Sequence, residues 1–517
     1  MHHMSALELS AAIRAKKLGV AEVVSAYFDH IERVDSHTNA FLTICKEHAL
    51  ARAKAVQPRI RNGEPLSPLA GVPIALSDNI STKGIRTTCA SKMLSEYVPV
   101  FNATVVDKLE QAGMIVVGKL NMDEFAMGNS SETGAFGPVR NPWDASRVAG
   151  GSSGGCAAAV AAGEVPLAIG SDTGGGIRQP CAFCGVTGIK PTYGAVSRYG
   201  LVAYASSMDQ IGPVGRNIDD CTALLSILSG PDERDSTCVP WKPFDFGKEV
   251  RDVAAFGKTA SGATHEDKLE SVRIGLPMNL FENDFDPDVK QAVLAAAKEL
   301  EAAGAHVEPF EMPLTEAVIP AFTIIACAEA SSNLARYDGL KYGHRSKNAE
   351  TLFEVYRLSR SEGFGLEVKR RIMFGSLVLS SGYYEGYYQK ALKVRSLIKN
   401  AYDGLFKRFD TILSPVAPTV AYRTGTNTDD PVKMVGGDIF TVPASLAGLP
   451  TVALPCGFSG KSTPNGEPDG MPARQQSRLP IGFQLVGDLF SEEKLIRVAR
   501  VYQRRTDYHM KRRDGLS

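Results

Sequence analysis

The sequence lacks an excess of charge of either sign. Its 517 residues include 57 Lys and Arg and 57 Asp and Glu, so the formal net charge at pH 7 is zero. No long block of one sign interrupts this balance. Proteins that grip a nucleic-acid backbone usually carry a concentrated basic face. The balance therefore argues against a main nucleic-acid-binding role, and any RNA contact is expected on a partner.

Long apolar runs are also missing. No run reaches the eighteen or so residues of a membrane-spanning helix. The first residues, Met1 to Met4, lead directly into a helical pattern without the cationic and apolar segments of a signal peptide. With 44% apolar and 22% charged residues, the chain has the composition of a large globular protein. We expect it to be cytoplasmic.

Metal-site spacings of cysteine and histidine are absent as well. The nine cysteines are odd in number and scattered in apolar or small-residue contexts, which is typical of reduced core thiols. Cys181 and Cys184 have CxxC spacing, but no second pair or histidine cluster accompanies them. Helix packing is therefore the favoured interpretation, and the sequence predicts no metal ligands.

Strand and helix patterns alternate along the first half of the chain. This alternation predicts an α/β fold with one large mixed sheet and helices on both faces. Apolar spacing predicts two helices between Leu7 and Val34, with a break at Gly19. Further helices are expected at 103–112, 154–162 and 286–303, and strands at 72–76, 114–118, 165–170 and 272–275.

Two glycine-rich segments lie beside predicted elements, one at the start of the helix 154–162 and one directly after the strand 165–170. One is Gly150–Gly155 (GGSSGG), and the other is Ser171–Pro180 (SDTGGGIRQP). Glycine is needed where the backbone adopts positive φ or approaches a ligand closely. Together with Gly71–Ile80 (GVPIALSDNI), these segments resemble the core of the amidase signature family.

The resemblance implies a Ser-Ser-Lys triad made of a lysine base, a relay serine in a cis peptide and a nucleophilic serine. The spacing of the three segments places the lysine position at Ser77, the relay serine at Ser152 and the nucleophile position at Gly176. Only Ser152 carries the family's residue. A plain turn hydroxyl is the alternative interpretation of Ser152, and the motif around it disfavours that alternative.

These two replacements remove the chemistry that a serine amidase needs. A serine hydroxyl attacks an amide only after a base takes its proton. Gly176 has no side chain and Ser77 has no basic nitrogen, and loss of a triad nucleophile alone costs about 10⁶-fold in turnover. The turn Thr173, Gly174, Gly175 can still direct backbone N–H groups at an oxyanion, as an oxyanion hole. Cys156 or Cys181 as a substitute nucleophile is disfavoured, because neither has an evident base.

The resemblance extends along nearly the whole chain, and is specific for the A subunits of glutamyl-tRNA(Gln) amidotransferases. It implies a single amidase-signature domain over 1–517. We expect an N-terminal helical part at 1–65, the signature core at 66–230, a surface excursion at 231–270, and at 271–517 the second half of the sheet with the substrate-binding part. A second exposed loop is expected at 459–480. The segments that carry this resemblance are 141–144, 193–201, 209–213, 329–334 and 361–365.

By this resemblance the substrate is glutamine and the chain is one subunit of a hetero-oligomer. Ammonia from glutamine would pass to a B subunit that binds tRNA and uses ATP and Mg²⁺, and a C subunit would complete the assembly. No cofactor is expected in this chain itself. Arg371, chosen over its neighbour Arg370, would hold the glutamine α-carboxylate and Asp438 its α-amine, because a guanidinium binds a carboxylate with two hydrogen bonds and a carboxylate pairs with an ammonium.

Two further positions depart from the family pattern. Gly436 and Gly437 stand where bulkier residues precede Asp438, and Phe322 or Thr323 falls where a substrate-facing tyrosine is expected. Three functions remain open: an A-subunit-like amidase captured in an inactive form, whether engineered or naturally degenerate; a non-catalytic scaffold or ammonia conduit; and a different amide-directed enzyme on the same fold.

Overall fold

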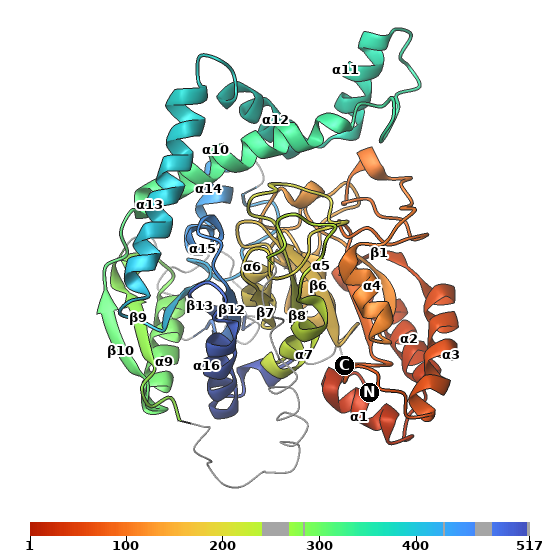
Figure 1. Ribbon diagram of the computed structural model, residues 1–517, viewed down its shortest axis with the longest axis vertical. Coiled ribbons are helices and arrows are strands. Elements are labelled where there is room, and N and C mark those ends of the chain that lie inside the picture. The colour runs from red at the N-terminus through yellow and green to blue at the C-terminus, as the bar shows by residue number, and fades with distance from the viewer. Residues whose placement is uncertain (240–267, 283–284, 428–429, 461–477, 514–517) are drawn as a thin grey trace, which may run out of the picture.

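The structure, a computed structural model, describes residues 1–239, 268–282, 285–427, 430–460 and 478–513. Eleven strands form one mixed sheet in the order β1-β3-β2-β6-β8-β7-β12-β13-β11-β9-β10, with helices around it (Figure 1). This confirms the predicted α/β architecture. The strands are β1 (Phe41–Ile44), β2 (Pro73–Ser77), β3 (Ile115–Leu120), β6 (Leu167–Asp172), β7 (Thr187–Lys190), β8 (Gln210–Gly215), β9 (Arg273–Pro277), β10 (His306–Phe310), β11 (Thr411–Pro415), β12 (Thr451–Phe458) and β13 (Pro480–Val486).

Three adjacent strands near the β1 edge of the sheet are buried along their whole length. Strands β2, β3 and β6 run parallel to one another, and every residue in them is buried. Because β2 pairs with β6 in parallel, their carboxyl ends lie side by side at one edge of the sheet. A short separate ribbon joins β4 (Arg140–Asn141) to β5 (Asp144–Val148).

The predicted elements of the first half are found close to their expected bounds. The break falls between the two helices as predicted: the first ends at Arg14, and Gly19 is the N-cap of the second, α2. The N-terminal part also contains the strand β1, which the sequence pattern did not predict. The predicted helices are α1 (Ala6–Arg14), α2 (Val20–Thr38), α4 (Thr104–Gln111), α5 (Gly154–Ala161) and α9 (Pro287–Ala302). The structure also contains α3 (Lys46–Arg61), α6 (Arg178–Cys184), α7 (Ile218–Leu228) and α16 (Glu492–Arg505), for which no bounds were predicted.

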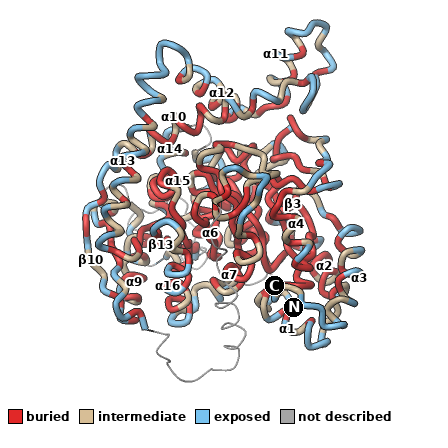
Figure 2. Tube along the Cα trace, viewed as in Figure 1, coloured by how far each residue is buried: buried red, intermediate tan, exposed pale blue. Residues whose placement is uncertain are grey.

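Four long helices form an arm across one end of the molecule, at the top of Figure 1. The colouring of Figure 2 shows that the outer part of this arm is largely exposed, in contrast to the sheet below it. Short helices α14 (Pro431–Gly436) and α15 (Val442–Leu446) lie between the arm and the sheet. The arm helices are α10 (Thr315–Asn333), α11 (Leu352–Gly363), α12 (Leu366–Val378) and α13 (Lys390–Leu405).

One helical stretch in the described residues, Thr315–Arg336, is long and apolar enough to cross a membrane by length and composition alone. Half of its most apolar window is buried inside the protein, and core helices of soluble proteins pass the same test. Most of the predicted surface excursion, 240–267, and of the predicted loop, 461–477, lies outside the described residues.

Candidate active site

The turn after β6 is fixed by a buried ion pair. Asp172, the last residue of β6, lies 2.9 Å from the Arg178 guanidinium at the start of α6, and both side chains are fully buried. Asp172 also accepts a hydrogen bond from the backbone N–H of Ile177. Arg178 donates further to the Thr441 carbonyl and to Ser445 Oγ. The pair therefore anchors both ends of the glycine-rich turn and does not face a substrate.

Within this turn, glycine is required by close packing and by backbone geometry. A Cβ added at Gly174 would stand 2.6 Å from the Phe322 ring, and Gly175 has a φ of +147°. Thr173 donates from its hydroxyl to Asp209 Oδ1 at 2.7 Å. Within the described chain, the N–H groups of Gly174, Gly175 and Gly176 make no hydrogen bond. They are available to an anion, as an oxyanion hole requires.

Ser152 stands directly against Gly176. The Gly151–Ser152 peptide is cis, and the N–H of Ser153 donates to the Gly176 carbonyl at 2.9 Å. A Cβ built on Gly176 would lie 2.8 Å from Ser152 Oγ and 2.6 Å from the Ser171 carbonyl oxygen. A side chain at 176 would therefore face the Ser152 hydroxyl, but only after a small backbone shift.

Ser77, at the end of β2, is fully buried, and its hydroxyl points at the Met122 sulfur, 3.4 Å away. It is not among the residues that line the cavity at the turn. The buried amine of Lys119 does not supply a base to this cavity, since Lys119 does not line it. The Lys119 Nζ donates to the Ile80 carbonyl and to Thr87 Oγ1, and lies 3.7 Å from Asp78. Burial lowers the pKa of Lys119, and the Asp78 carboxylate opposes that shift.

The cavity brings together most of the residues that the sequence singled out, although they come from distant parts of the chain. Its volume is about 20 Å³, enough for one or two water molecules. Neither lysine nor histidine lines it, and its titratable groups are one arginine, one tyrosine and one aspartate. The lining residues are Ala126, Gly128, Gly151, Ser152, Thr173, Gly174, Gly175, Gly176, Tyr204, Phe322, Arg371, Val435 and Asp438.

Arg371 reaches the cavity from α12 and is held by two partners. Its Nε donates to Glu367 at 2.7 Å, and its Nη1 donates to the Tyr204 hydroxyl. The guanidinium also lies 5.4 Å from the centre of the Tyr204 ring. Arg370, the alternative in this Arg-Arg pair, bonds Glu367 and does not line the cavity. Of the two arginines, only Arg371 can meet a ligand here.

Asp438 lies opposite, just beyond α14. Its Oδ1 accepts hydrogen bonds from Asn129 Nδ2 at 3.2 Å and from Gln179 Nε2 at 3.4 Å. Burial raises the pKa of Asp438 to about 7, although the Asn129 hydrogen bond and the Arg371 charge oppose the shift. Gly436 faces open space, so no side chain from that position covers the carboxylate.

The structure distinguishes the two candidates for the expected tyrosine position. Phe322 lines the cavity and covers Gly174. Thr323 turns away and donates to the Ile319 carbonyl on its own helix. Of the two candidates, Phe322, whose ring carries no hydroxyl, is therefore the one that faces the cavity.

Sequence reasoning missed the supporting residues Asn129, Gln179, Tyr204 and Asp209. Asp209 lies in a segment that carried the family resemblance, but nothing in the sequence linked it to Thr173. Tyr204 and Asn129 had no local signal, because each acts through a partner more than a hundred residues away in the chain.

The cysteines take no visible part in this site. All nine are free and buried, and neither Cys156 nor Cys181 lines the cavity. Burial raises the pKa of both thiols, which disfavours the nucleophilic thiolate. In the part of the chain that the structure covers, no group of three His, Cys, Asp or Glu side chains could hold a metal ion.

Comparison with known proteins gives one consistent result. The sequence profile of the family described as Amidase matches residues 22–496. The A subunit of glutamyl-tRNA(Gln) amidotransferase from Lachnoclostridium phytofermentans is 50% identical over 97% of this chain and 98% of its own length. That from Carboxydothermus hydrogenoformans is 48% identical over 99% of each chain. The crystal structure of the A subunit from Thermotoga maritima superposes with a TM-score of 0.72 at 39% identity, over 93% of this chain and 91% of that one.

Proposed function

The chain belongs to the amidase family, and we propose that it is an A-subunit-like amidase of the glutamyl-tRNA(Gln) amidotransferase kind that has lost its own glutamine hydrolysis. The observation that carries this proposal is the cavity itself. It holds Ser152 and the free N–H groups of the turn, but glycine stands at the nucleophile position and no lysine or histidine lines the walls.

The loss concerns proton transfer and covalent attack. In the proposed ancestral chemistry, a base takes the proton of the nucleophilic serine through the relay serine. Here Ser152 would have neither a nucleophile nor a base beside it. Gly176 has no side-chain oxygen, and the Ser77 hydroxyl is directed at the Met122 sulfur. The Thr173–Gly176 turn would still stabilise an oxyanion, which alone leaves about 10³- to 10⁴-fold over water.

The substrate-gripping half is retained in this proposal. Arg371 would bind the glutamine α-carboxylate and Asp438 its α-ammonium group. Their side chains line the same small cavity, and each is held by neutral or oppositely charged partners. A cavity of about 20 Å³ does not hold glutamine, so binding would require Phe322 to move off Gly174.

The exposed arm supports a role within a hetero-oligomer. Phe353, Leu366 and Met373 on α11 and α12 are 73%, 70% and 74% exposed, and the outer arm is shown as exposed tube in Figure 2. Clustered exposed apolar side chains mark interaction surfaces. We therefore propose that B and C subunits cover this chain, and that tRNA, ATP and Mg²⁺ bind to the partner, in the cytoplasm.

Ammonia release from glutamine tests this proposal. The chain and a Ser77→Lys/Gly176→Ser double variant are each assembled with candidate B and C subunits, and ammonia is measured. We expect release by the double variant alone, with both single variants inactive. Activity of the unchanged chain would overturn the assignment of the triad positions.

A scaffold or ammonia-conduit role is the second candidate, favoured by a cavity of only about 20 Å³, which does not hold glutamine. It is tested in the same assembly. Transamidation with ammonium chloride but not with glutamine would support it. Silence of the double variant, together with thermal stabilisation by another amide, would instead support a repurposed enzyme.

A further inference from the structure

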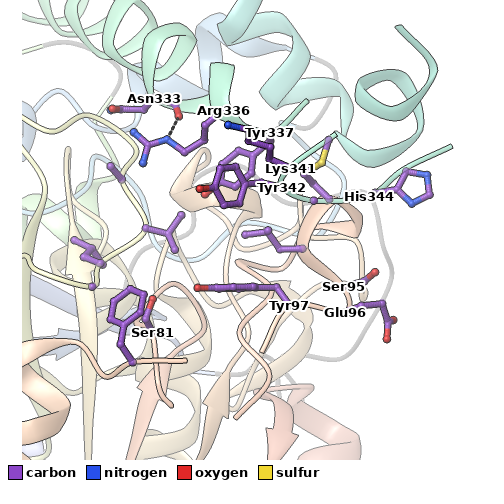
Figure 3. A pocket seen from close by; sticks show the side chains of 18 of the residues that line it. Ser81, Ser95, Glu96, Tyr97, Asn333, Arg336, Tyr337, Lys341, Tyr342 and His344 are labelled. Atoms are coloured by element: carbon purple, nitrogen blue, oxygen red, sulfur yellow. Dashed lines mark hydrogen bonds between the residues drawn. The ribbon is translucent and has the colours of Figure 1, made fainter. Parts of the chain in front are cut away.

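A second, much larger cavity in the described chain lies away from the candidate active-site cavity and shares no lining residue with it. Its volume is about 930 Å³, within the range of small-molecule sites. Two walls face each other across it in Figure 3. One wall comes from 81–101 and 199–203, and the other from the segment Asn333–Arg345 that follows α10.

Aromatic side chains line both walls. Tyr97 and Phe101 lie on the first wall, while Tyr337 and Tyr342 lie on the second (Figure 3). Tyr337 is fixed by the rings of Phe125 and Phe364, with centroids 5.3 and 6.4 Å away. Tyr342 is 58% exposed, and among the described residues no aromatic ring packs against it. A planar ligand ring inserted between the walls would gain stacking contacts on both sides.

Cations concentrate on the second wall. Arg336, Lys341 and Arg345 all line the pocket, and no carboxylate in the described residues lies within ion-pair distance of any of them. His344 is paired with Glu362 outside this group, and Glu96 is the one acid in the lining. Three cations without counter-charges beside one acid make the pocket attractive to an anion.

We propose that this pocket binds a small anion that carries a planar aromatic ring, the chemistry of a nucleoside monophosphate. The ring would lie between Tyr97 and Tyr342, and the anionic group would be bound by Lys341 and Arg345. Arginine and lysine bind phosphate through charge-assisted hydrogen bonds. The concave shape and the zero net charge of the chain favour a small molecule over a nucleic-acid strand.

The pocket and the candidate active-site cavity are connected through the segment that contains Tyr204. Asn333, on its second wall, donates to the Tyr204 carbonyl at 3.1 Å and to Ser206 Oγ at 3.0 Å. Tyr204 in turn lines the catalytic cavity and bonds Arg371. The ligand would therefore occupy a site separate from the amide site, with one backbone segment between them. This inference does not depend on whether the triad is active.

Calorimetric titration of the full chain with adenosine 5′-monophosphate tests the proposal. We expect saturable binding of the nucleotide, and at least tenfold weaker binding of adenosine and of inorganic phosphate tested separately. Failure of the nucleotide to bind would overturn the proposal. Equal affinity for phosphate alone would also overturn it, because the ring would then play no part.

Variants at exposed positions locate the binding. A Lys341→Glu/Arg345→Glu double variant is expected to lose at least tenfold in affinity, and Tyr342→Ala about threefold or more. Matched controls are Lys54→Glu on α3 and Tyr387→Ala beside α13, which change the same residue types elsewhere on the surface. Binding that is unchanged by the pocket variants, or equally weakened by the controls, would overturn the proposal.

Discussion

The ends of the neighbouring strands β6 and β2 lie close to the candidate active-site cavity, and they differ in the interactions that their side chains make. At the end of β6 two buried polar pairs form, Asp172 with Arg178 and Thr173 with Asp209. At the end of the parallel strand β2, the Ser77 hydroxyl contacts only sulfur atoms among the described side chains, those of Met122 and Cys156. The interactions at the end of β6 hold the backbone of the turn in place. The end of β2 is the proposed position of the family's lysine, the base for proton transfer.

The difference teaches that shape and chemistry are carried by separate residues here. The Asp172–Arg178 and Thr173–Asp209 pairs hold the turn in place, and of these four residues only Thr173 lines the cavity. In the proposed assignment, Ser77 and Gly176 stand where the family has functional side chains, and neither makes a contact of the two buried pairs. Such a site can lose catalysis and still fold, since buried polar networks are costly to break and triad side chains are not part of them.

The largest effect is expected from Ser152 once the other two triad positions are restored. In the Ser77→Lys/Gly176→Ser background, Ser152→Ala should lower glutamine hydrolysis about 10³-fold or more, because triad members act as a unit. In the unchanged chain the same substitution should leave ammonia release at background. Retention of activity by the triple variant would show that the relay lies elsewhere. Thermal unfolding of each variant controls for loss of fold.

Next in size is the buried ion pair at the β6 end. Arg178→Leu leaves the Asp172 carboxylate buried and uncompensated, which costs about 3–5 kcal/mol of unfolding free energy. Urea unfolding measures this loss. The control is Asp172→Asn together with Arg178→Leu, which should cost clearly less than the two single changes summed. Additive losses would show that the pair does not act as a unit.

Asp438 also lines the cavity, and its titration predicts a pH dependence of the unfolding free energy. Its folded pKa of about 7 lies above the value of about 3.9 expected when unfolded. Between these values the folded state binds more protons, so the unfolding free energy falls as pH rises from about 4 to 7. Asp438→Asn removes this fall. It should stabilise the protein at pH 8 by up to about 4 kcal/mol, at about 1.4 kcal/mol per pKa unit, and by little at pH 4, measured by urea unfolding at both values.

The elements on which the site stands were predictable because their signals are local. The predicted strand 72–76 is β2 at Pro73–Ser77, and the predicted helix 154–162 is α5 at Gly154–Ala161. The packing of Phe322 on Gly174 was not predictable, since it joins α10 to a turn far away in the sequence. The pairing of Arg371 with Tyr204 depends on the same long-range assembly.

The mapping of the triad positions shows the same limit. The juxtaposition of Ser152 and Gly176 follows the motif, and the structure brings both to the cavity. That Ser77 stays outside the cavity lining follows from the length of its side chain and from the direction of its hydroxyl toward Met122. The spacing of sequence motifs cannot predict the direction in which a hydroxyl points.

A matched pair of small substitutions sharpens the comparison of the two strand ends. Thr173→Val removes the hydroxyl that donates to the buried Asp209 carboxylate, and should cost about 1–3 kcal/mol of unfolding free energy. Ser77→Ala removes a hydroxyl of the same kind from β2, but its partners are the Met122 thioether and the Cys156 thiol, and sulfur atoms form only weak hydrogen bonds. The cost at Ser77 should stay below about 0.5 kcal/mol, because little hydrogen bonding is lost and the methyl group remains buried. Urea unfolding of both variants under one condition decides the matter. Equal losses at the two positions would mean that Ser77 is as deeply built into the fold as the turn, and that its replacement of a lysine was structural as well as chemical.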